Sequence, residues 1–339
     1  MWTVASRSEV TRGGATDQLE HALEAHRREL TGYCYRMLGS GFDAEDAVQE
    51  TMVRAWRNVD QLETQAALRA WLYRIATNVC LDMLQARQRR ARPMDLQESQ
   101  TADIANLDGG LPEHAWVQPA PDARMLPAEG DPAELAAARE TVRLAFVAAL
   151  QHLPPRQRAV LILREVLRWQ ASEVAELLDT TTVSINSALQ RARATMDAAD
   201  LDAHTAQREA ADEEQQALLA RYCDAFERYD IGELVSLLRA DAVFSMPPYK
   251  LWLRGPEEAG RWMLGPGIGC KDSRVFQTAA NGGPAAATYK PADDGSGWTP
   301  WALIVLEMDG AQITGLHHFL YPELFPAFGL PERIERDDA

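Results

Sequence analysis

The sequence lacks several features that would place it in common classes of protein. No apolar run among its 339 residues approaches the ~20 residues needed to cross a bilayer, so we do not expect a membrane protein. The first residues, MWTVASRSEVTRGG, contain no apolar core of the signal-peptide type, and we therefore expect no secretion. The two helical blocks described below also lack a glycine-rich phosphate loop, an HExxH sequence and a nucleophile elbow, which are common signatures of enzymes.

Cysteine is scarce as well, and the four residues are far apart: Cys34, Cys80, Cys223 and Cys270. Their separation excludes the CxxC spacing of metal and redox sites. Disulfides are rare in reducing compartments, so the simplest interpretation is a cytoplasmic protein with thiols in its core. We expect no metal, no cofactor and no catalytic residue.

Positive charge is in deficit, since 34 Lys and Arg against 50 Asp and Glu give a net charge of -16. That sum argues against nucleic acid, whose phosphates require clustered Lys and Arg, but the charge is unevenly distributed. Between residues 93 and 135 nine acids oppose only Arg124: Asp95, Glu98, Asp103, Asp108, Glu113, Asp122, Glu129, Asp131 and Glu134. Between residues 67 and 92 only Asp82 opposes six arginines: Arg69, Arg74, Arg87, Arg89, Arg90 and Arg92. Local basic surfaces are therefore expected.

The periodicity of apolar residues predicts three folded blocks. Residues 17–92 and 135–197 are helical throughout, whereas residues 213–331 combine one helix with strand-like runs in an α+β domain. The strand-like runs are DAVFSM, AAATYK, WALIVLEM and QITGLHHFLY. The acidic segment 93–134 is rich in Pro and Gly and is expected to be a disordered, flexible linker. Residues 198–212 form a second linker, either an extension of the preceding helix or a flexible tether.

The stretch FDAEDAVQETMVRAWRNV predicts a helix that begins at about Asp43, with Asp43 as its cap and acids in its first turn. Its apolar stripe is Ala47, Val48, Thr51, Met52, Ala55 and Trp56. The opposite face carries Asp46, Gln49, Glu50 and Val53. By itself this polar face indicates either an ordinary solvated surface or a partner surface. A further helix from about Ala67 buries Leu68, Leu72, Ile75, Ala76, Val79 and Met83, and points Arg69, Tyr73 and Asn78 elsewhere.

The stretch WQASEVAELLDTTTVSINSALQRARATM has the layout of a helix-turn-helix, in which DTTT turns the chain into a second helix capped by Thr182. That helix buries Ile185, Ala188, Leu189, Ala192 and Met196. The residues outside this buried side could contact DNA. Small hydroxyl and amide residues in the N-terminal half of the helix suit base edges, and the arginines that follow suit phosphates. The candidates are Thr182, Val183, Ser184, Asn186, Ser187, Gln190, Arg191 and Arg193. A helical hairpin with an arginine-bearing surface is the alternative interpretation.

These two blocks resemble bacterial RNA polymerase sigma factors of the ECF (extracytoplasmic function) group. The resemblance rests on FDAEDAVQETMVRAWRNV with RAWLYRIATNVCLDML, and on LQHLPPRQRAVLILREVLRWQASEVAELLDTTTVSINSALQRARATM. It implies two all-α domains, the first for core polymerase and the promoter -10 element (17–92) and the second for the -35 element (135–197). The implied partners are promoter DNA and core RNA polymerase, through the clamp helices of the largest subunit and the flap of the second-largest.

The resemblance assigns residues to these surfaces. The face of Asp46, Gln49, Glu50 and Val53 becomes the surface for the clamp helices, where acids suit a basic partner. The expected -10 contacts are Arg69, Arg74, Asn78, Arg87, Arg89 and Arg90, and the loop 58–68 lies where a flipped base would be held. The helix-turn-helix residues given above are the expected -35 contacts. We expect Trp56 and Trp71 to pack in the core rather than stack on bases.

Residues 213–331 resemble a SnoaL-like domain, the cone-shaped α+β fold of polyketide cyclases and ketosteroid isomerases. The resemblance rests on ADAVFSMPPYKLWLRGPEEAGRWM and ITGLHHFLYPELFPAFGLP. It implies a possible ligand pocket, for which the candidates are Tyr222, Met246, Trp252, Trp262, His317 and Phe319. Among acid-base candidates, which also include Asp224, Asp241 and His318, no spacing forces a catalytic pair. At most one of His317 and His318 enters the cone, because neighbours on a strand face opposite sides.

The sequence therefore predicts a promoter-specificity factor, not an enzyme, which is regulated in cis through an intramolecular contact between its SnoaL-like and sigma domains. The acidic linker either runs through the RNA channel of the polymerase or acts as a tether. Two rival hypotheses remain open. In one, the SnoaL-like domain is an active small-molecule enzyme whose state the sigma part reports. In the other, the protein regulates transcription by binding DNA without polymerase.

Overall fold

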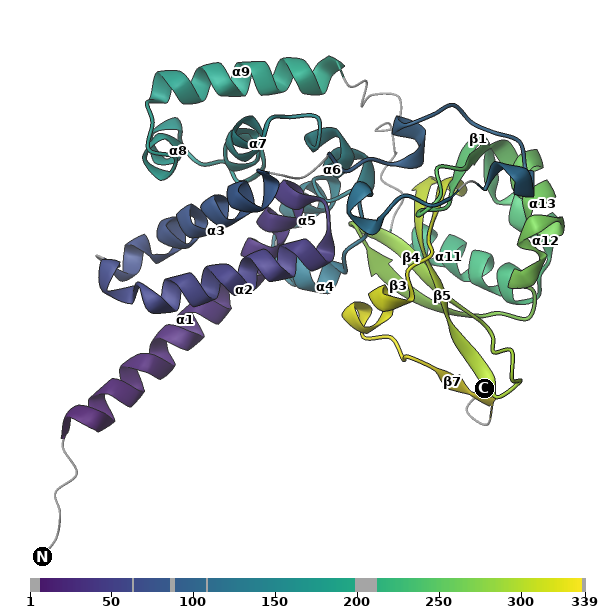
Figure 1. The fold of residues 1–339 in the computed structure, drawn as a ribbon, viewed down its shortest axis with the longest axis horizontal. Helices are drawn as coiled ribbons and strands as arrows, with labels where there is room; N and C mark the ends of the chain where they lie inside the picture. Colours follow the sequence, from purple (N-terminus) through teal and green to yellow (C-terminus); the bar gives the residue numbers. More distant parts are fainter. Residues whose placement is uncertain (1–6, 63, 86–88, 108, 199–211, 337–339) are drawn as a thin grey trace, which may run out of the picture.

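The structure is a computed structural model that describes residues 7–62, 64–85, 89–107, 109–198 and 212–336. An N-terminal helical part and a C-terminal part built on a sheet lie side by side, and the segment after α3 crosses between them (Figure 1). Over the described ranges, no helix combines the length and apolarity needed to cross a membrane.

The first helical domain consists of α1 (Arg7–Leu38), α2 (Gly41–Arg57) and α3 (Leu68–Leu84). Helix α2 begins two residues before Asp43, because the side chain of Ser40 accepts the hydrogen bond of the Asp43 amide at 3.3 Å and acts as the cap. Asp43 instead forms an ion pair with Arg90 at 2.6 Å. The predicted cap is therefore corrected from Asp43 to Ser40.

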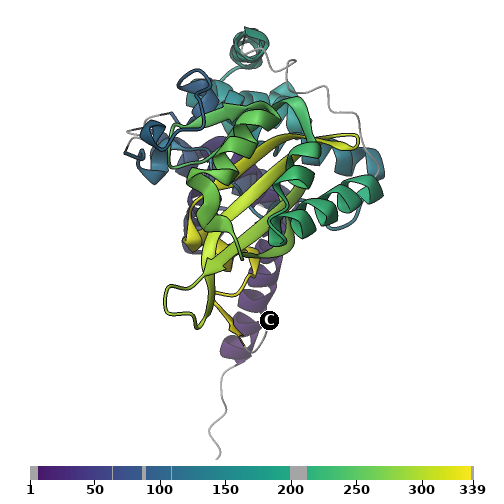
Figure 2. The same cartoon turned by 90° about the vertical axis from the view of Figure 1, so that its right-hand side faces the viewer.

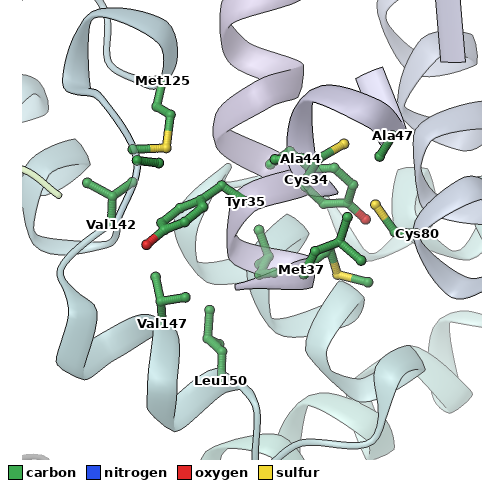
Figure 3. Packing of buried hydrophobic residues seen from close by; sticks show 14 of the residues in the cluster. Cys34, Tyr35, Met37, Ala44, Ala47, Cys80, Met125, Val142, Val147 and Leu150 are labelled. Atoms are coloured by element: carbon green, nitrogen blue, oxygen red, sulfur yellow. The ribbon is translucent and has the colours of Figure 1, made fainter. Parts of the chain in front are cut away.

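The core of this domain contains most of the predicted apolar positions, with two exceptions. Trp56 was expected in the core, but it is 41% exposed because α2 ends one residue later, beyond the packed part of the helix. Tyr73 was expected to point away from the core, but it is fully buried between Tyr33 and Trp169, with ring centroids 5.2 and 5.1 Å away. Trp169 belongs to the second helical domain, so this partner is invisible to local periodicity. Figure 3 shows the packing of Cys34 and Cys80 in the same core.

The second helical domain comprises five α-helices: α5 (Pro132–Glu140), α6 (Leu144–Leu150), α7 (Pro155–Leu161), α8 (Ala171–Leu177) and α9 (Thr182–Ala198). A π-helical turn, Ile162–Val166, extends α7. Helices α8 and α9 form the predicted helix-turn-helix, and Ile185, Leu189, Ala192 and Met196 are buried as expected. The cap of α9 is Thr181 rather than Thr182, since the Thr181 hydroxyl accepts from the Ser184 amide at 3.2 Å.

The segment 93–134, expected to be disordered, is ordered in the structure. It forms short helical turns at Pro93–Asp95, Ile104–Asn106, Glu113–Ala115 and Asp122–Met125 (α4). Several of its apolar side chains are buried, and Trp116 is fully enclosed, whereas Leu96 and Ile104 are exposed. Composition predicted disorder because the segment has no core of its own, but it packs into cores that other domains supply. The expected second linker, 198–212, lies almost entirely outside the described residues.

The C-terminal domain contains one sheet covered on one face by α11 (Asp212–Glu227), α12 (Ile231–Ser236) and α13 (Gly255–Leu264), as Figure 2 shows. The strands are β1 (Leu238–Ser245), β2 (Trp252–Arg254), β3 (Arg274–Ala280), β4 (Gly283–Pro291), β5 (Gly297–Asp309), β6 (Gln312–Phe319) and β7 (Ile334–Glu335). The order is β2-β1-β6-β5-β4-β3, β7 pairs with β5, and only β1 and β6 run parallel. Strands β2, β3 and β7 and helices α12 and α13 were not predicted.

The two faces of this sheet belong to different cores. One face packs under α11, α12 and α13 and forms a core within the domain. On the other face, residues such as Ala287, Leu303 and Phe319 join one continuous apolar cluster with the helical domains. The C-terminal domain is therefore attached through its sheet, and not merely by the chain connection.

Candidate polymerase, promoter and interdomain surfaces

The face of α2 that was predicted to bind a partner is open to solvent. Asp46, Gln49, Glu50 and Val53 are all exposed, and Val53 is an apolar residue that is 37% exposed. Glu50 forms an ion pair with Arg54 at 2.7 Å, one helical turn later, which leaves both side chains largely solvated. An exposed acidic face that ends in one apolar residue suits a basic partner that buries Val53.

The predicted -35 face of α9 is also open. All eight residues assigned to it are exposed: Thr182, Val183, Ser184, Asn186, Ser187, Gln190, Arg191 and Arg193. Only Arg193 is held by an ion pair, with Glu165 at 2.5 Å. A helix of this length with polar residues near its N-terminus and arginines beyond them fits a DNA major groove.

The residues predicted for the -10 element do not share one surface. Asn78 is exposed, and Arg89 is exposed with its guanidinium 2.8 Å from Nδ1 of His152. Arg90, by contrast, is 6% exposed and donates to the carbonyl of Trp116 at 2.7 Å. It therefore holds in place the segment 93–134, called the connecting segment below. Arg87 lies outside the described residues.

The remaining two -10 candidates face the second helical domain. Arg74 donates to the carbonyl of Glu176 in α8 at 3.1 Å. The guanidinium of Arg69 lies 5.4 Å from the ring of Trp169, in addition to its ion pair with Glu29 at 2.9 Å. In this arrangement the second helical domain contacts part of the surface that was predicted to face promoter DNA.

A cleft of about 610 Å³ runs between these two domains. On one side it is lined by the end of the predicted base-pocket loop and by α3, including Leu62 and Trp71, which is half-buried. On the other side α8 contributes Glu173 and Glu176. The carboxylate of Glu176 lies 4.0 Å from the guanidinium of Arg74, so α8 brings negative charge to this side of α3.

The β3–β4 hairpin makes the most specific contact between the C-terminal domain and the helical domains. Its tip residue Asn281 is 3% exposed, and its side-chain amide donates to the Tyr35 hydroxyl at 2.5 Å and to the Val142 carbonyl at 2.7 Å. Its side-chain oxygen accepts from the Ala120 amide at 3.1 Å. Tyr35 in turn donates to the carbonyl of Gln118 at 2.8 Å. One residue thus joins α1, the connecting segment and the start of the second helical domain.

The backbone of this turn requires its sequence, Asn-Gly. Asn281 and Gly282 have φ values of 56° and 76°, the left-handed region that Asn tolerates and Gly adopts freely. A Cβ at Gly282 would also lie 2.5 Å from the carbonyl oxygen of Arg139. The Gly282 amide donates to a carboxylate oxygen of Asp122 at 2.8 Å. Burial raises the pKa of Asp122 to about 6, and neither this hydrogen bond nor the nearby charge of Arg139 fully offsets it.

The connecting segment is fastened to the C-terminal domain along its first half. The Gln100 amide donates to the carbonyl of Trp252 at 2.9 Å, and the Leu111 amide donates to that of Pro248 at 2.9 Å. The indole of Trp252 donates back to the carbonyl of Gln97 at 2.8 Å. Because its second half is fastened to α1 through Gln118, the segment ties both parts of the molecule together.

A charged cluster strengthens the same interface on the sheet. His317 lies with Nδ1 2.8 Å from the Ser245 hydroxyl and Nε2 3.4 Å from a carboxylate oxygen of Glu307. Burial alone would raise the pKa of Glu307, but His317, Arg92 and Arg143 together hold it at about 2. The two arginines come from the helical part of the chain, so Glu307 carries a negative charge toward that part.

A small cavity lies in the apolar core between the sheet and its helices. Of the proposed ligand residues, only Tyr222 lines this cavity. Of the two neighbouring histidines, His318 lines it and His317 does not. The cavity has a volume of about 20 Å³, which is room for about one water molecule. Burial, and then the neighbouring His317, lower the pKa of His318 to about 3, so its imidazole is neutral.

The other proposed ligand residues lie elsewhere: Met246 and Trp262 are buried, Phe319 faces the helical domains, and Trp252 binds the connecting segment. The acidic candidates Asp224 and Asp241 pair with surface arginines, Arg228 and Arg239, outside the cavity.

Sequence reasoning missed the residues that join the domains, chiefly Asn281, Asp122 and Trp116. A signal existed for the first of these, since Asn-Gly between two strand-like runs is the strongest short indication of a hairpin. Nothing local indicated that the hairpin tip would be buried against another domain.

Comparisons with known proteins identify the families of the two helical domains and relatives of the whole chain. The model of the Sigma-70 region 2 family matches residues 22–90, and that of the Sigma-70, region 4 family matches residues 143–196. The ECF RNA polymerase sigma factor SigG of Mycobacterium tuberculosis is 45% identical over 313 residues, which cover 92% of this chain and 83% of the relative. SigJ of the same species is 29% identical over 72% of this chain and 71% of the relative. The crystal structure of that species' SigJ superposes with a TM-score of 0.59 at 24% identity, covering 91% of this chain and 98% of SigJ, which shows a shared fold.

Proposed function

We propose, from the premise that this chain belongs to the ECF RNA polymerase sigma factors, that its C-terminal domain regulates it in cis. As a member of that group the chain binds core RNA polymerase and directs it to promoters, and it acts as a transcription initiation factor and not as an enzyme. Its partners, polymerase and promoter DNA, lead us to expect that it acts in the cytoplasm.

The observation that carries the proposal is the buried hairpin tip at Asn281. Both the amide nitrogen and the carbonyl oxygen of its side chain are hydrogen-bonded, to α1, the connecting segment and Val142. A buried amide satisfied across three segments fixes their relative positions, because separating them leaves polar groups without partners. The C-terminal domain would thereby hold the two sigma domains together.

While the C-terminal domain holds the two sigma domains together, the second sigma domain limits the access of DNA to two arginines of the first. Arg74 is engaged by α8, and Arg69 is engaged by Trp169. Opening of a promoter by the first domain would require both arginines to be released. The polymerase face of α2 and the -35 face of α9 are exposed throughout, so encounter with polymerase would precede release.

We assign the exposed face Asp46, Gln49, Glu50 and Val53 to the clamp helices of polymerase. The -35 contacts are assigned to the eight exposed residues of α9. For the -10 element we retain Arg69, Arg74, Asn78, Arg87 and Arg89, and we regard Arg90 as a structural residue because it is buried and paired with Asp43.

The C-terminal domain acts by contact and not by catalysis under this proposal. A cavity of about 20 Å³ holds no substrate, and the candidate acids Asp224 and Asp241 pair with arginines on the surface. Incubation of the full chain with small-molecule substrates of isomerases and cyclases should therefore give no turnover.

Run-off transcription with purified core polymerase tests the proposal, on a promoter selected by genome-wide binding. The full chain is compared with Asn281→Ala and with the matched control Gln312→Ala, an exposed residue of the same sheet. We expect Asn281→Ala to change initiation several-fold in the direction of higher activity, and Gln312→Ala to behave as the wild type. Equal activity of all three proteins would contradict regulation through this contact. Promoter binding that needs no polymerase would favour a polymerase-independent regulator.

A further inference from the structure

A groove of about 800 Å³ runs between α1, α5 and the π-helical turn that extends α7. Its volume falls within the roughly 300–1,000 Å³ of pockets for small molecules. It differs from the cleft lined by α3, although Leu167 and Arg168 border both. Apolar residues form much of its wall, namely Ala25, Met125, Pro127, Ala133, Ala137 and Leu167.

Helix α5 forms one wall of this groove and leaves its alanine face uncovered. None of its nine residues is buried, and Ala133 and Ala137, which line the groove, are exposed. The helix begins where the Asp131 side chain accepts from the amides of Ala133 and Glu134, at 2.9 and 3.4 Å. A helix of this length is marginal unless an apolar face is packed, so the uncovered alanines are suited to contact a ligand.

Arg36 is the buried cation of the groove lining and is only 5% exposed. Its Nη1 donates to the Gly32 carbonyl at 2.7 Å and its Nη2 to the Thr141 hydroxyl at 2.7 Å. Each terminal nitrogen carries two hydrogens, so one N–H on each has no acceptor among the described residues. Burial lowers the pKa of Arg36 to about 10, which leaves it charged at neutral pH.

Two more arginines of the lining, Arg28 and Arg168, are exposed. Neither forms an ion pair with a carboxylate in the part of the chain that the structure describes. The backbone of Arg168 has a φ of 57°, in the left-handed region that a long side chain rarely adopts. Such strain is found preferentially at functional sites, and here it holds an arginine at the edge of the groove.

Three carboxylates also line the groove, but two of them are already neutralised. Glu29 pairs with Arg69 at 2.9 Å, and Glu165 pairs with Arg193 at 2.5 Å. Glu134 lies in the first turn of α5, where the helix dipole favours negative charge. The lining therefore carries an excess of positive charge, which suits an anion.

We propose that this groove binds a small organic anion with a phosphate or carboxylate head and an apolar body. The head accepts from the remaining N–H groups of Arg36, and hydrogen bonds between charged groups are the stronger kind. Arg28 and Arg168 add positive charge along the groove. The apolar body covers the exposed alanines of α5, which removes their surface from water.

The ligand would contact three parts of the chain at once. Its walls come from α1 of the first sigma domain, from Met125 of the connecting segment, and from α5 and the turn after α7 of the second sigma domain. Binding would thus favour the packed arrangement of the two sigma domains. This consequence rests on the proposed regulation in cis, whereas the binding itself does not.

Isothermal titration of the full chain with octyl phosphate and, separately, octanoate tests the proposal. Both are used below their critical micelle concentrations, at constant ionic strength with chloride as the background salt. Octanol lacks the charged head and inorganic phosphate lacks the apolar body, so they are the matched control probes. We expect saturable one-to-one binding of at least one octyl anion, at least tenfold tighter than that of either control probe.

Two pairs of variants locate the site. Ala137→Trp fills the groove and should abolish binding, whereas Ala194→Trp, at an exposed alanine of α9 outside the lining, should bind as the wild type does. Arg28→Gln should weaken binding several-fold, and the neighbouring Arg27→Gln, also exposed but outside the lining, should not. Arg36→Met should lose binding if circular dichroism shows that it folds; Ala137→Trp, at an exposed position, decides the matter if it does not.

No saturable binding of either octyl anion by the wild type would overturn the proposal, as would unchanged binding by Ala137→Trp. Octanol or inorganic phosphate binding as tightly as the octyl anions would also overturn it, because the head and the body would then not act together. Saturable binding that leaves run-off transcription unaltered would support the site while counting against regulation in cis, so the two failures are distinguishable.

Discussion

At the scale of single residues, buried polar side chains decide how the domains are held. Asn281, Arg36 and Arg158 each donate to a backbone carbonyl of another segment: Asn281 to Val142, Arg36 to Thr141 at 3.1 Å, and Arg158 to Met37 at the end of α1. Such residues are costly to bury and are stable only while every partner stays in place. They therefore make the interface all-or-none, which suits a switch.

Asp122 gives a prediction with a pH dependence. Burial raises its pKa to about 6, against about 3.9 in an unfolded chain, so the folded protein binds the proton more tightly than the unfolded chain does. The folded protein, with the hairpin tip inserted, should lose stability as pH rises from about 4 to about 6, and it should stay less stable above pH 6. At about 1.4 kcal/mol per pKa unit, the total loss is up to about 3 kcal/mol.

Asp122→Asn keeps an oxygen that accepts from the Gly282 amide but removes the buried charge. Urea unfolding should show the variant to be more stable than the wild type at pH 7.5, with the difference shrinking toward pH 4. A difference that is constant with pH would show that the carboxyl is not buried against the hairpin.

At the scale of elements, the connecting segment 93–134 has the largest effect on the architecture. Its Trp116 is fully buried, and its backbone pairs with Ala91 through hydrogen bonds of 2.8 and 3.0 Å. A segment with few apolar residues can remain ordered when some of them, here Trp116 and Val117, enter a core built by others.

Trp116→Ala should therefore weaken the molecule well beyond an ordinary linker substitution. Replacing a buried tryptophan by alanine costs about 3–5 kcal/mol in a packed core. We expect a clearly lower melting temperature and faster proteolysis between residues 97 and 120. The matched control is Leu96→Ala, since Leu96 is 43% exposed in the same segment and should shift the melting temperature little.

Helix α2 supplies the prediction for polymerase. Reversing two charges, Asp46→Lys with Glu50→Lys, should abolish binding to core polymerase because both residues lie on the exposed acidic face. The control Glu214→Lys reverses an exposed charge on α11. Retained polymerase binding by the double variant, measured by gel filtration with core enzyme, would return this face to an ordinary solvated surface.

At the scale of the whole molecule, the two sigma domains, the connecting segment and one face of the C-terminal sheet share one connected apolar cluster. Figure 1 shows the helical part and the sheet lying side by side. The sheet uses one face for its own helices and the other for the sigma domains. Under the proposed regulation in cis, release of the predicted promoter surface would therefore be a rearrangement of domains rather than a movement of one loop.

Small-angle scattering measures that rearrangement. The Asn281→Ala variant should have a larger radius of gyration than the wild type, because loss of the hairpin contact lets the domains separate on the connecting segment. Gln312→Ala serves again as the control. Identical scattering of all three proteins would mean that the remaining sheet contacts suffice to keep the molecule closed.

The sequence by itself determined the features that depend on neighbours along the chain. The apolar stripe of α3 at Leu68, Leu72 and Val79, the buried side of α9, and the opposite faces of His317 and His318 follow from helical and strand periodicity. The exposed faces of α2 and α9 follow from the same patterns, because the residues of a helix that do not belong to its buried stripe face solvent.

Only the tertiary structure decided the features that depend on distant partners. Tyr73 is buried because Trp169 packs on it, Trp116 is ordered because other domains enclose it, and Arg74 has a hydrogen-bond partner because α8 reaches it. Periodicity reports which face of an element is apolar, but burial also depends on which surface arrives from elsewhere. The hairpin tip at Asn281 illustrates the limit, since its two residues specify a turn and say nothing of the site into which the turn inserts.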